Sequence, residues 1–185
     1  MNTVVKNITR RKFLSHAAGI AVAASLPQNV FAGIKPVELV RGLSLHNLHT
    51  EEKVSLSYFE QGAYVTEALQ DINYLLRDHR TGDVSVMDPL LMDLLYDLKT
   101  VLGTERPFQV ISGYRSPKTN AALHGKSKGV ASKSLHMQGK AIDIRIPGIA
   151  SETIHAAALS LARGGVGLYT RSNFVHIDTG RVRSW

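Results

Sequence analysis

Two histidines and one aspartate have the residue types and the spacing of a metal site. Asp143 follows His136 by seven positions, and a second histidine, His176, lies 33 positions further along the chain. Two imidazole nitrogens and one carboxylate oxygen are a ligand set of catalytic zinc sites, in which the fourth position stays open for water. We therefore predict that these three residues bind Zn²⁺. The spacing alone also fits a second interpretation, in which Asp143 is a surface carboxylate and His136 a loop residue.

The strand expected around Asp143 directs this side chain away from the apolar layer. Apolar residues alternate over residues 140–146, which predicts a strand with Ile142, Ile144 and Ile146 on one face. Asp143 lies on the other face. The alternation therefore favours a carboxylate that is presented on a sheet surface, where a metal is accessible.

A second strand is predicted for His176. Residues 165–169 and 174–178 form a strand pair joined by a turn at 170–173. His176 and Asp178 lie on the same face of the second strand, about 6.7 Å apart along it. With this spacing, one of the two side chains can bind the metal while the other interacts with the water molecule on the metal.

The remaining patterns predict one α+β domain. Apolar residues repeat at period two in some segments and at i, i+3, i+4 in others. We expect Asp88 and Ser151 to cap helices. The sheet is predicted to be small and mainly antiparallel, with flanking helices and a zinc site in a groove. The expected elements are a hairpin over 37–59, a strand over 107–111, and helices over 63–79, 89–102, 117–123 and 151–161.

Two loops are expected beside this groove. Residues 112–116 follow a predicted strand and contain glycine, which is typical of a junction that presents functional side chains. Residues 124–134 are polar and predict a surface loop that overhangs the site. Three further histidines, His46, His49 and His155, are interpreted as exposed or edge side chains rather than as ligands.

Residues 1–32 have the features of a signal peptide. A charged segment with the pair Arg10 and Arg11 precedes a small-residue apolar run and a cleavage site that ends at Ala32. The arginine pair is typical of the twin-arginine route. The apolar run is about half of the ~20 residues that a membrane-spanning helix needs, so we expect no stable membrane anchor after cleavage. We predict a periplasmic protein with a catalytic domain over residues 33–185.

Composition excludes several kinds of chemistry. The 185 residues include no cysteine, so a disulfide framework, a thiolate zinc site and a cysteine nucleophile are all absent. The net charge is +7, but Lys6, Arg10, Arg11 and Lys12 lie in the leader; without them, 18 basic residues face 15 acidic ones. We therefore expect no nucleic-acid partner. Nothing in the composition predicts the oligomeric state.

Four motifs of the chain resemble one enzyme family. They are I-S-G-Y-R-S at 111–116, S-x-H-x-x-G-x-A-x-D at 134–143, G-G-V-G-x-Y at 164–169 and V-H-I-D at 175–178. In this combination they resemble the D-alanyl-D-alanine zinc peptidases, whose fold is shared with lysostaphin-type endopeptidases and the hedgehog signalling domain. More closely, they resemble the subgroup that contains murein endopeptidase K.

The resemblance implies a function for the predicted site. It implies that His136, Asp143 and His176 bind Zn²⁺ and that Arg115 binds substrate and stabilises the developing oxyanion. It also implies that the protein hydrolyses the stem peptides of peptidoglycan in the periplasm, notably cross-links that join two diaminopimelate residues. Two alternatives remain open: a carboxypeptidase that trims terminal residues, and a non-catalytic zinc-containing module that binds the cell wall.

One position departs from the family pattern. Many members carry a glutamate as general base three residues before the last histidine ligand, whereas this chain has Asn173 there. Asp178 is our candidate for the base, because it shares a strand face with His176. Its alternative role is to accept the free ring N–H of a ligand histidine and fix the orientation of that ring.

Overall fold

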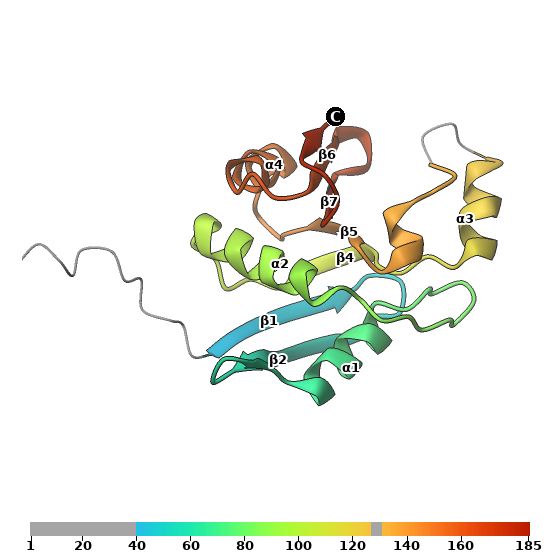
Figure 1. The fold of residues 1–185 in the computed structure, drawn as a ribbon. Helices are drawn as coiled ribbons and strands as arrows, with labels where there is room; N and C mark the ends of the chain where they lie inside the picture. The colour runs from blue at the N-terminus through green and yellow to red at the C-terminus, as the bar shows by residue number, and fades with distance from the viewer. Residues whose placement is uncertain (1–39, 127–130) are drawn as a thin grey trace, which may run out of the picture. The chain divides into compact units, whose positions relative to one another are not determined.

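The computed structural model describes residues 40–126 and 131–185 (Figure 1). The leader predicted at 1–32 and the middle of the predicted loop, residues 127–130, lie outside the described residues. The elements are β1 (Val40–Asn47), β2 (Lys53–Glu60), β3 (Ala63–Tyr64), α1 (Thr66–Leu75), α2 (Pro89–Leu102), β4 (Phe108–Ser112), α3 (Pro117–His124), η1 (Leu135–Gln138), β5 (Ala141–Arg145), α4 (Ser151–Ser160), β6 (Gly165–Tyr169), η2 (Thr170–Ser172), β7 (Phe174–Asp178) and β8 (Arg183–Ser184).

The strands of the described region form one mixed sheet. Their order is β3-β2-β1-β4-β5-β7-β6-β8. The pairs β1/β4 and β6/β8 are parallel and the other five are antiparallel, which confirms the predicted α+β class and the mainly antiparallel sheet. Between β1 and β4 the chain passes through α1 and α2, which is the kind of long connection that a parallel pair requires.

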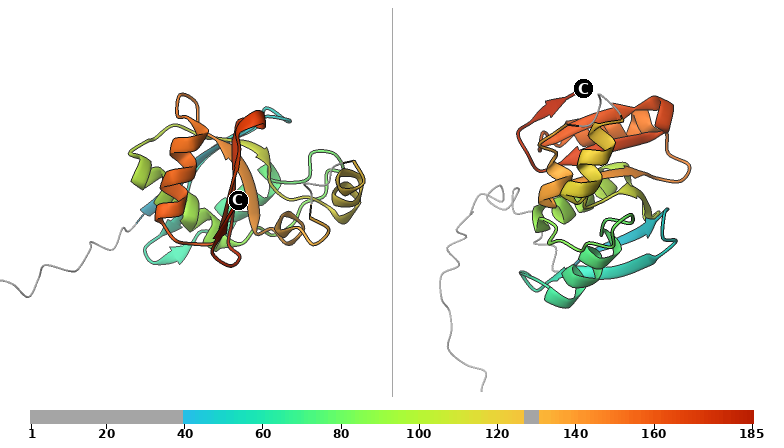
Figure 2. Two further views of the ribbon diagram at one scale, coloured as in Figure 1. Left: turned by 90° about the horizontal axis from the view of Figure 1, so that it is seen from above. Right: turned by 90° about the vertical axis from the view of Figure 1, so that its right-hand side faces the viewer.

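Helices cover one face of this sheet and leave the other for the site. Figure 2 shows α2 and α4 on one side of the strands, with α3 and η1 on the opposite side. On β5, Ile142 and Ile144 belong to the hydrophobic core, while Asp143 between them points to the other face. On β7, Val175 and Ile177 are likewise core residues. The alternation read from the sequence therefore holds on both strands.

Helix α2 is the main core helix, and its ends match their predicted signals. The carboxylate of Asp88 accepts the backbone N–H of Leu90 at 3.0 Å, and Pro89 occupies the first helical position. Gly103 ends the helix with a φ of +59°. Most leucine and methionine side chains of α2 are buried in the core, whereas Leu90 in the first turn is exposed.

Helix α1 is shorter at both ends than the predicted span of 63–79. At its start, Ala63 and Tyr64 pair with β2 instead, and the Tyr64 hydroxyl donates to Asp93 of α2 at 2.7 Å. After its end, the buried carboxylate of Asp78 accepts the backbone N–H of Ser116 at 2.9 Å. Long-range contacts at both ends therefore override the local helical pattern.

Two further differences concern α4 and the last strand. Ser151 is the first residue of α4 rather than its cap, because Ala150 occupies the cap position and the Ser151 hydroxyl donates to Glu152 at 3.4 Å. The strand β8, which pairs with β6, was not predicted. No described helix is long and apolar enough to cross a membrane.

Candidate metal centre

Strand register brings two of the three predicted ligands side by side. Asp143 on β5 pairs directly with His176 on β7, and His176 in turn pairs with Gly167 on β6. His136 comes from η1, whose first turn is capped when the hydroxyl of Ser134 accepts the His136 backbone N–H at 3.3 Å. All three predicted ligands are buried.

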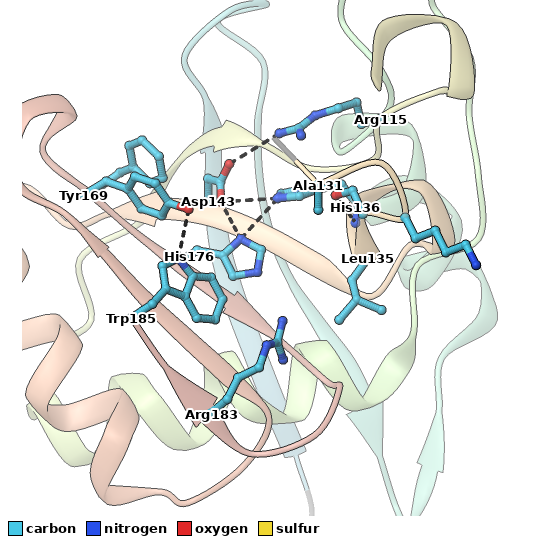
Figure 3. A pocket seen from close by; sticks show the side chains of 12 residues that line it. Arg115, Ala131, Leu135, His136, Asp143, Tyr169, His176, Arg183 and Trp185 are labelled. Carbon is cyan, nitrogen blue, oxygen red and sulfur yellow. Dashed lines mark hydrogen bonds and ion pairs between the residues drawn. The ribbon is translucent and has the colours of Figure 1, made fainter. Parts of the chain in front are cut away.

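The three side chains meet with distances that suit a single metal ion. The Nε2 atom of His136 lies 3.2 Å from Nδ1 of His176 and 3.3 Å from Oδ1 of Asp143, and the last two atoms are 2.8 Å apart (Figure 3). A tetrahedral ion with zinc–ligand distances of about 2.0–2.1 Å separates its ligand atoms by about 3.3–3.4 Å. The donor types and two of the three separations therefore fit Zn²⁺, while the 2.8 Å between Asp143 and His176 is a hydrogen-bond distance.

Each histidine is held by its outward nitrogen. The Nδ1–H of His136 donates to the carbonyl oxygen of Gly113 at 2.7 Å, and the Nε2–H of His176 donates to Oδ2 of Asp178 at 3.0 Å. Each bond fixes the ring and directs the other nitrogen toward the centre, where it could bind a metal ion. Carbonyl and carboxylate partners of this kind are typical around metal-binding histidines.

Asp178 is fully buried and surrounded by donors. Its Oδ1 accepts the backbone N–H groups of Gly165 and Gly180 at 3.0 and 2.8 Å, and Arg183 donates to both carboxylate oxygens. Burial raises the pKa of Asp178, but the hydrogen bonds from His176, Arg183 and the two backbone groups lower it well below its ordinary value. Asp178 is thus a charged hydrogen-bond acceptor at any physiological pH.

Burial and hydrogen bonding also have opposite effects on the pKa values of His176 and Asp143. Burial lowers the pKa of His176, but hydrogen bonds to Asp143 and Asp178 outweigh it and raise that pKa to about 9. Burial raises the pKa of Asp143, whereas the neighbouring His136 and His176 rings bring it well below the ordinary value. The centre is therefore built to hold a cation, whether a proton or a metal ion.

Arg115 reaches the centre from the loop after β4. Its backbone N–H donates to the carbonyl oxygen of His136 at 3.2 Å, and its Nη2 lies 3.7 Å from Oδ2 of Asp143. Nη2 also donates to the Ser112 hydroxyl at 3.3 Å. Burial lowers the pKa of Arg115 from its ordinary value. Its Nε is buried and has no hydrogen-bond partner among the described residues.

The loop that carries Arg115 is clamped by the segment after α1. The backbone N–H of Tyr114 donates to the carbonyl oxygen of Leu76 at 2.7 Å. A Cβ atom at Gly113 would lie 2.5 Å from the same oxygen, so glycine is required there. The same glycine supplies the carbonyl that holds His136, and the loop therefore positions two functional side chains at once.

A pocket of about 490 Å³ opens over these residues. The sequence predicted part of its lining, namely the three metal ligands, Arg115 and the end of the predicted 124–134 loop. It missed the lining that comes from Arg183 and Trp185, and it missed the Gly113 carbonyl. No local pattern signals the first pair, because Arg183 and Trp185 reach the pocket through the pairing of β8 with β6. The pocket is lined by Arg115, Ala131, Lys133, Ser134, Leu135, His136, Asp143, Tyr169, Phe174, His176, Arg183 and Trp185.

The other residues singled out from the sequence lie outside this centre. His46 Nε2 faces Glu51 at 2.9 Å, and the His49 ring stacks on His79 with centroids 3.8 Å apart. Asn173 adopts a left-handed conformation with φ of +50° in the turn before β7, and it does not line the pocket. The position of the family glutamate is thus occupied by a turn residue.

The fold and the donor set define a class: an α+β domain in which a His–Asp–His cluster that could hold one metal ion lines a pocket. Comparison with known proteins makes the assignment specific. The chain belongs to the family described as peptidoglycan L,D-endopeptidase MepK, whose profile matches residues 35–185. This result confirms the resemblance that the four motifs indicated.

Several curated proteins are similar over nearly the full chain. Peptidoglycan L,D-endopeptidase MepK of Escherichia coli strain K12 is 48% identical over 177 residues, which is 95% of this chain and 96% of that protein. The protein of the same name from Shigella flexneri gives the same values. Probable peptidoglycan L,D-endopeptidase MepK of Haemophilus influenzae is 41% identical over 186 residues, covering 100% of this chain and 98% of its own.

Proposed function

We propose that the chain is a zinc-dependent endopeptidase that hydrolyses peptide cross-links of peptidoglycan. The observation that carries the proposal is the convergence of three ligand atoms at 2.8–3.3 Å, with both outward histidine nitrogens held, in a member of this family. The names of its relatives specify an L,D-endopeptidase. We assign the same bond to this chain, including cross-links between two diaminopimelate residues.

His136, Asp143 and His176 hold the metal in this proposal. A bound Zn²⁺ lowers the pKa of a coordinated water toward ~7 and polarises a carbonyl group, which is the chemistry that amide hydrolysis needs. The protein contributes the fixed orientation of the ligands. Gly113 and Asp178 keep the inward nitrogens of the two histidines unprotonated once the metal is bound.

Arg115 is assigned to binding the scissile carbonyl. Its guanidinium is always charged and lines the pocket beside Asp143. A fixed N–H donor aimed at an oxygen that gains negative charge stabilises the transition state most when water is excluded. Burial of Arg115 provides that exclusion.

Asp178 is assigned to orienting His176 rather than to accepting the proton of water. It is fully buried, and five donors occupy its two oxygens. A general base needs a lone pair within reach of the water proton. Among the described residues that line the pocket, Asp143 is the only carboxylate.

Product analysis tests the proposed reaction. Cross-linked muropeptide dimers are incubated with the zinc-loaded protein and the products are weighed by mass spectrometry. An endopeptidase converts dimers into monomers, a carboxypeptidase releases single amino acids, and a wall-binding module keeps its zinc and releases nothing. His136→Ala should lose zinc and cleavage together, and full activity in a metal-free His136→Ala protein would contradict the proposal.

We further propose that residues 1–32 form a twin-arginine signal peptide and that residues 33–185 act in the periplasm. The family profile begins at residue 35, three positions after Ala32. Replacing Arg10 and Arg11 together with lysine should keep the protein in the cytoplasm, as fractionation would measure. Unchanged export of this double variant would contradict the twin-arginine assignment.

A further inference from the structure

Trp185 forms part of the pocket wall beside the metal centre. Its ring centroid lies 5.3 Å from that of His176, and 49% of the residue remains exposed (Figure 3). The roles assigned above to the metal ligands and to Arg115 do not use this side chain. A large aromatic surface left open inside a pocket is a candidate for ligand contact.

Strand β6 forms the surface against which this indole packs. The Trp185 backbone N–H donates to Val166 at 3.3 Å and the Leu168 N–H donates to Trp185 at 3.0 Å, so Trp185 runs alongside β6. A Cβ atom at Gly167 would lie 2.5–2.7 Å from three atoms of the indole. Because Gly167 pairs with His176, the missing side chain lets the indole lie close to that ligand, with the two ring planes tilted by 47°.

Neighbouring side chains fix the orientation of the ring. The indole N–H donates to the Tyr169 hydroxyl at 3.0 Å, and the Arg183 guanidinium lies 4.9 Å from the ring centroid. Tyr169 itself stacks on Phe174 with centroids 4.5 Å apart. We call Tyr169, Phe174 and Trp185 the aromatic wall. A ring held in this way loses little conformational freedom when a ligand covers its open face.

We propose that Trp185 binds the substrate peptide, with a planar amide group or an aliphatic side-chain stem stacked on the indole next to the scissile bond. This inference rests on the proposed function, since it names the surface that receives the peptide in the same pocket. The wall lies directly beside His176, so a peptide placed over the metal must pass along it. Stacking on a fixed aromatic face contributes mainly to binding and not to the chemical step.

Trp185 is the only tryptophan of the chain, which makes its fluorescence a direct probe. The zinc-loaded protein is titrated with a purified muropeptide monomer, which occupies the pocket without a cross-link to cleave. We expect acrylamide quenching to fall about twofold at saturation, because ligand pockets bury most of the surface of what they bind. Unchanged quenching while the monomer inhibits turnover, or absence of any binding, would overturn the proposal.

Variants separate substrate binding from support of His176. Trp185→Ala should raise KM about tenfold with kcat within about twofold, which is the pattern of lost uniform binding. Trp185→Phe should recover most of the affinity. Gly167→Ala should resemble Trp185→Ala, because it displaces the ring, whereas Gly125→Ala adds a Cβ at ordinary contact distances of 3.6 and 3.8 Å and should match the parent protein.

Zinc content is measured for every variant and distinguishes this inference from the proposed reaction. We expect one zinc per chain in all four proteins. Loss of zinc together with a fall in kcat in Trp185→Ala would show that the indole only supports His176, and would overturn its assignment to substrate. If cleavage is absent but the monomer still protects the indole from acrylamide, the proposed reaction fails and the peptide-binding surface stands.

Discussion

At the residue scale, the centre depends on which nitrogen each histidine turns inward. His136 uses Nε2 because its Nδ1–H is bound to Gly113, and His176 uses Nδ1 because its Nε2–H is bound to Asp178. The two rings therefore approach one point from η1 and from β7 with opposite tautomers. The partner of His136 is a backbone carbonyl, but the partner of His176 is a side chain, so a substitution of Asp178 changes the orientation of a ligand without changing a ligand itself.

Asp178→Asn tests the orienting role. The amide keeps the size of the side chain but loses its charge and leaves Arg183 without its ionic partner. We expect zinc affinity to fall about 10- to 100-fold, as is typical when a partner of a ligand histidine is changed. Competition with a chromophoric chelator measures this affinity.

The control for this variant is Asp97→Asn. Asp97 also pairs with an arginine, Arg163, but lies on the surface away from the centre. The Asp97→Asn substitution should leave zinc affinity unchanged. If Asp178→Asn abolishes turnover while its zinc affinity equals that of the parent, then Asp178 acts as the general base and the orienting role is wrong.

The raised pKa of His176 predicts how the metal-free protein responds to pH. In the folded protein this pKa is about 9, against an ordinary value of 6.5. The protonated ring therefore contributes stability that is fully present below pH 6.5 and is lost as the pH rises through 9. The loss is about 3 kcal/mol, since each unit of pKa difference is worth about 1.4 kcal/mol.

Urea unfolding in the presence of chelator measures this dependence. The free energy of unfolding should decrease between pH 6.5 and pH 9, and His176→Gln should lack that decrease. A parent protein whose stability stays level or increases over this range would contradict the assignment of the proton to His176.

At the element scale, the sequence could predict which face of each strand the site residues occupy. Alternation in β5 and β7 depends only on neighbouring residues, and it correctly separated Asp143 and His176 from the core. The ends of α2 were predictable for the same reason, because Asp88 and Gly103 act within one turn of the helix.

The parts of the fold and of the site that the sequence did not predict depend on contacts between distant segments. The shortened α1 follows from the pairing of Tyr64 with β2 and from the bond between Asp78 and Ser116, which no local pattern encodes. The short strand β8 has little propensity of its own and forms by pairing with β6. That pairing supplies Arg183 and Trp185, so the pocket wall could not be predicted from the sequence.

Asp88→Ala tests the link between α2 and the site. Asp88 caps α2 through Leu90, and its other oxygen accepts the Thr179 hydroxyl at 2.8 Å, just after β7. Loss of a cap and one hydrogen bond should lower the free energy of unfolding by about 1–2 kcal/mol. Urea unfolding measures the change. Asp71→Ala, an exposed change on α1, is the control, and equal stability of the two variants would contradict the role of the cap.

At the scale of the whole molecule, the centre joins parts of the chain that are far apart in sequence. The ligands come from η1, β5 and β7, and the loop after β4 contributes Arg115 and the Gly113 carbonyl. A metal ion bound by all three ligands ties these segments together in the folded state only. Metal binding must therefore contribute to the stability of the domain.

Thermal unfolding measures that contribution. At a free zinc concentration 100 times Kd, linkage adds about 2.7 kcal/mol, which should raise Tm by about 5–10 °C for a domain of this size. His136→Ala is the control and should show no rise. An equal rise in His136→Ala would place the stabilising metal elsewhere on the molecule.

The most direct test of the central claim is a zinc titration of the metal-free parent protein, with cleavage of cross-linked muropeptide dimers as the readout. The centre of His136, Asp143 and His176 predicts no cleavage in chelator. It also predicts recovery that grows linearly and levels off at one equivalent of zinc per chain. Full cleavage by protein shown to contain no metal would contradict the account.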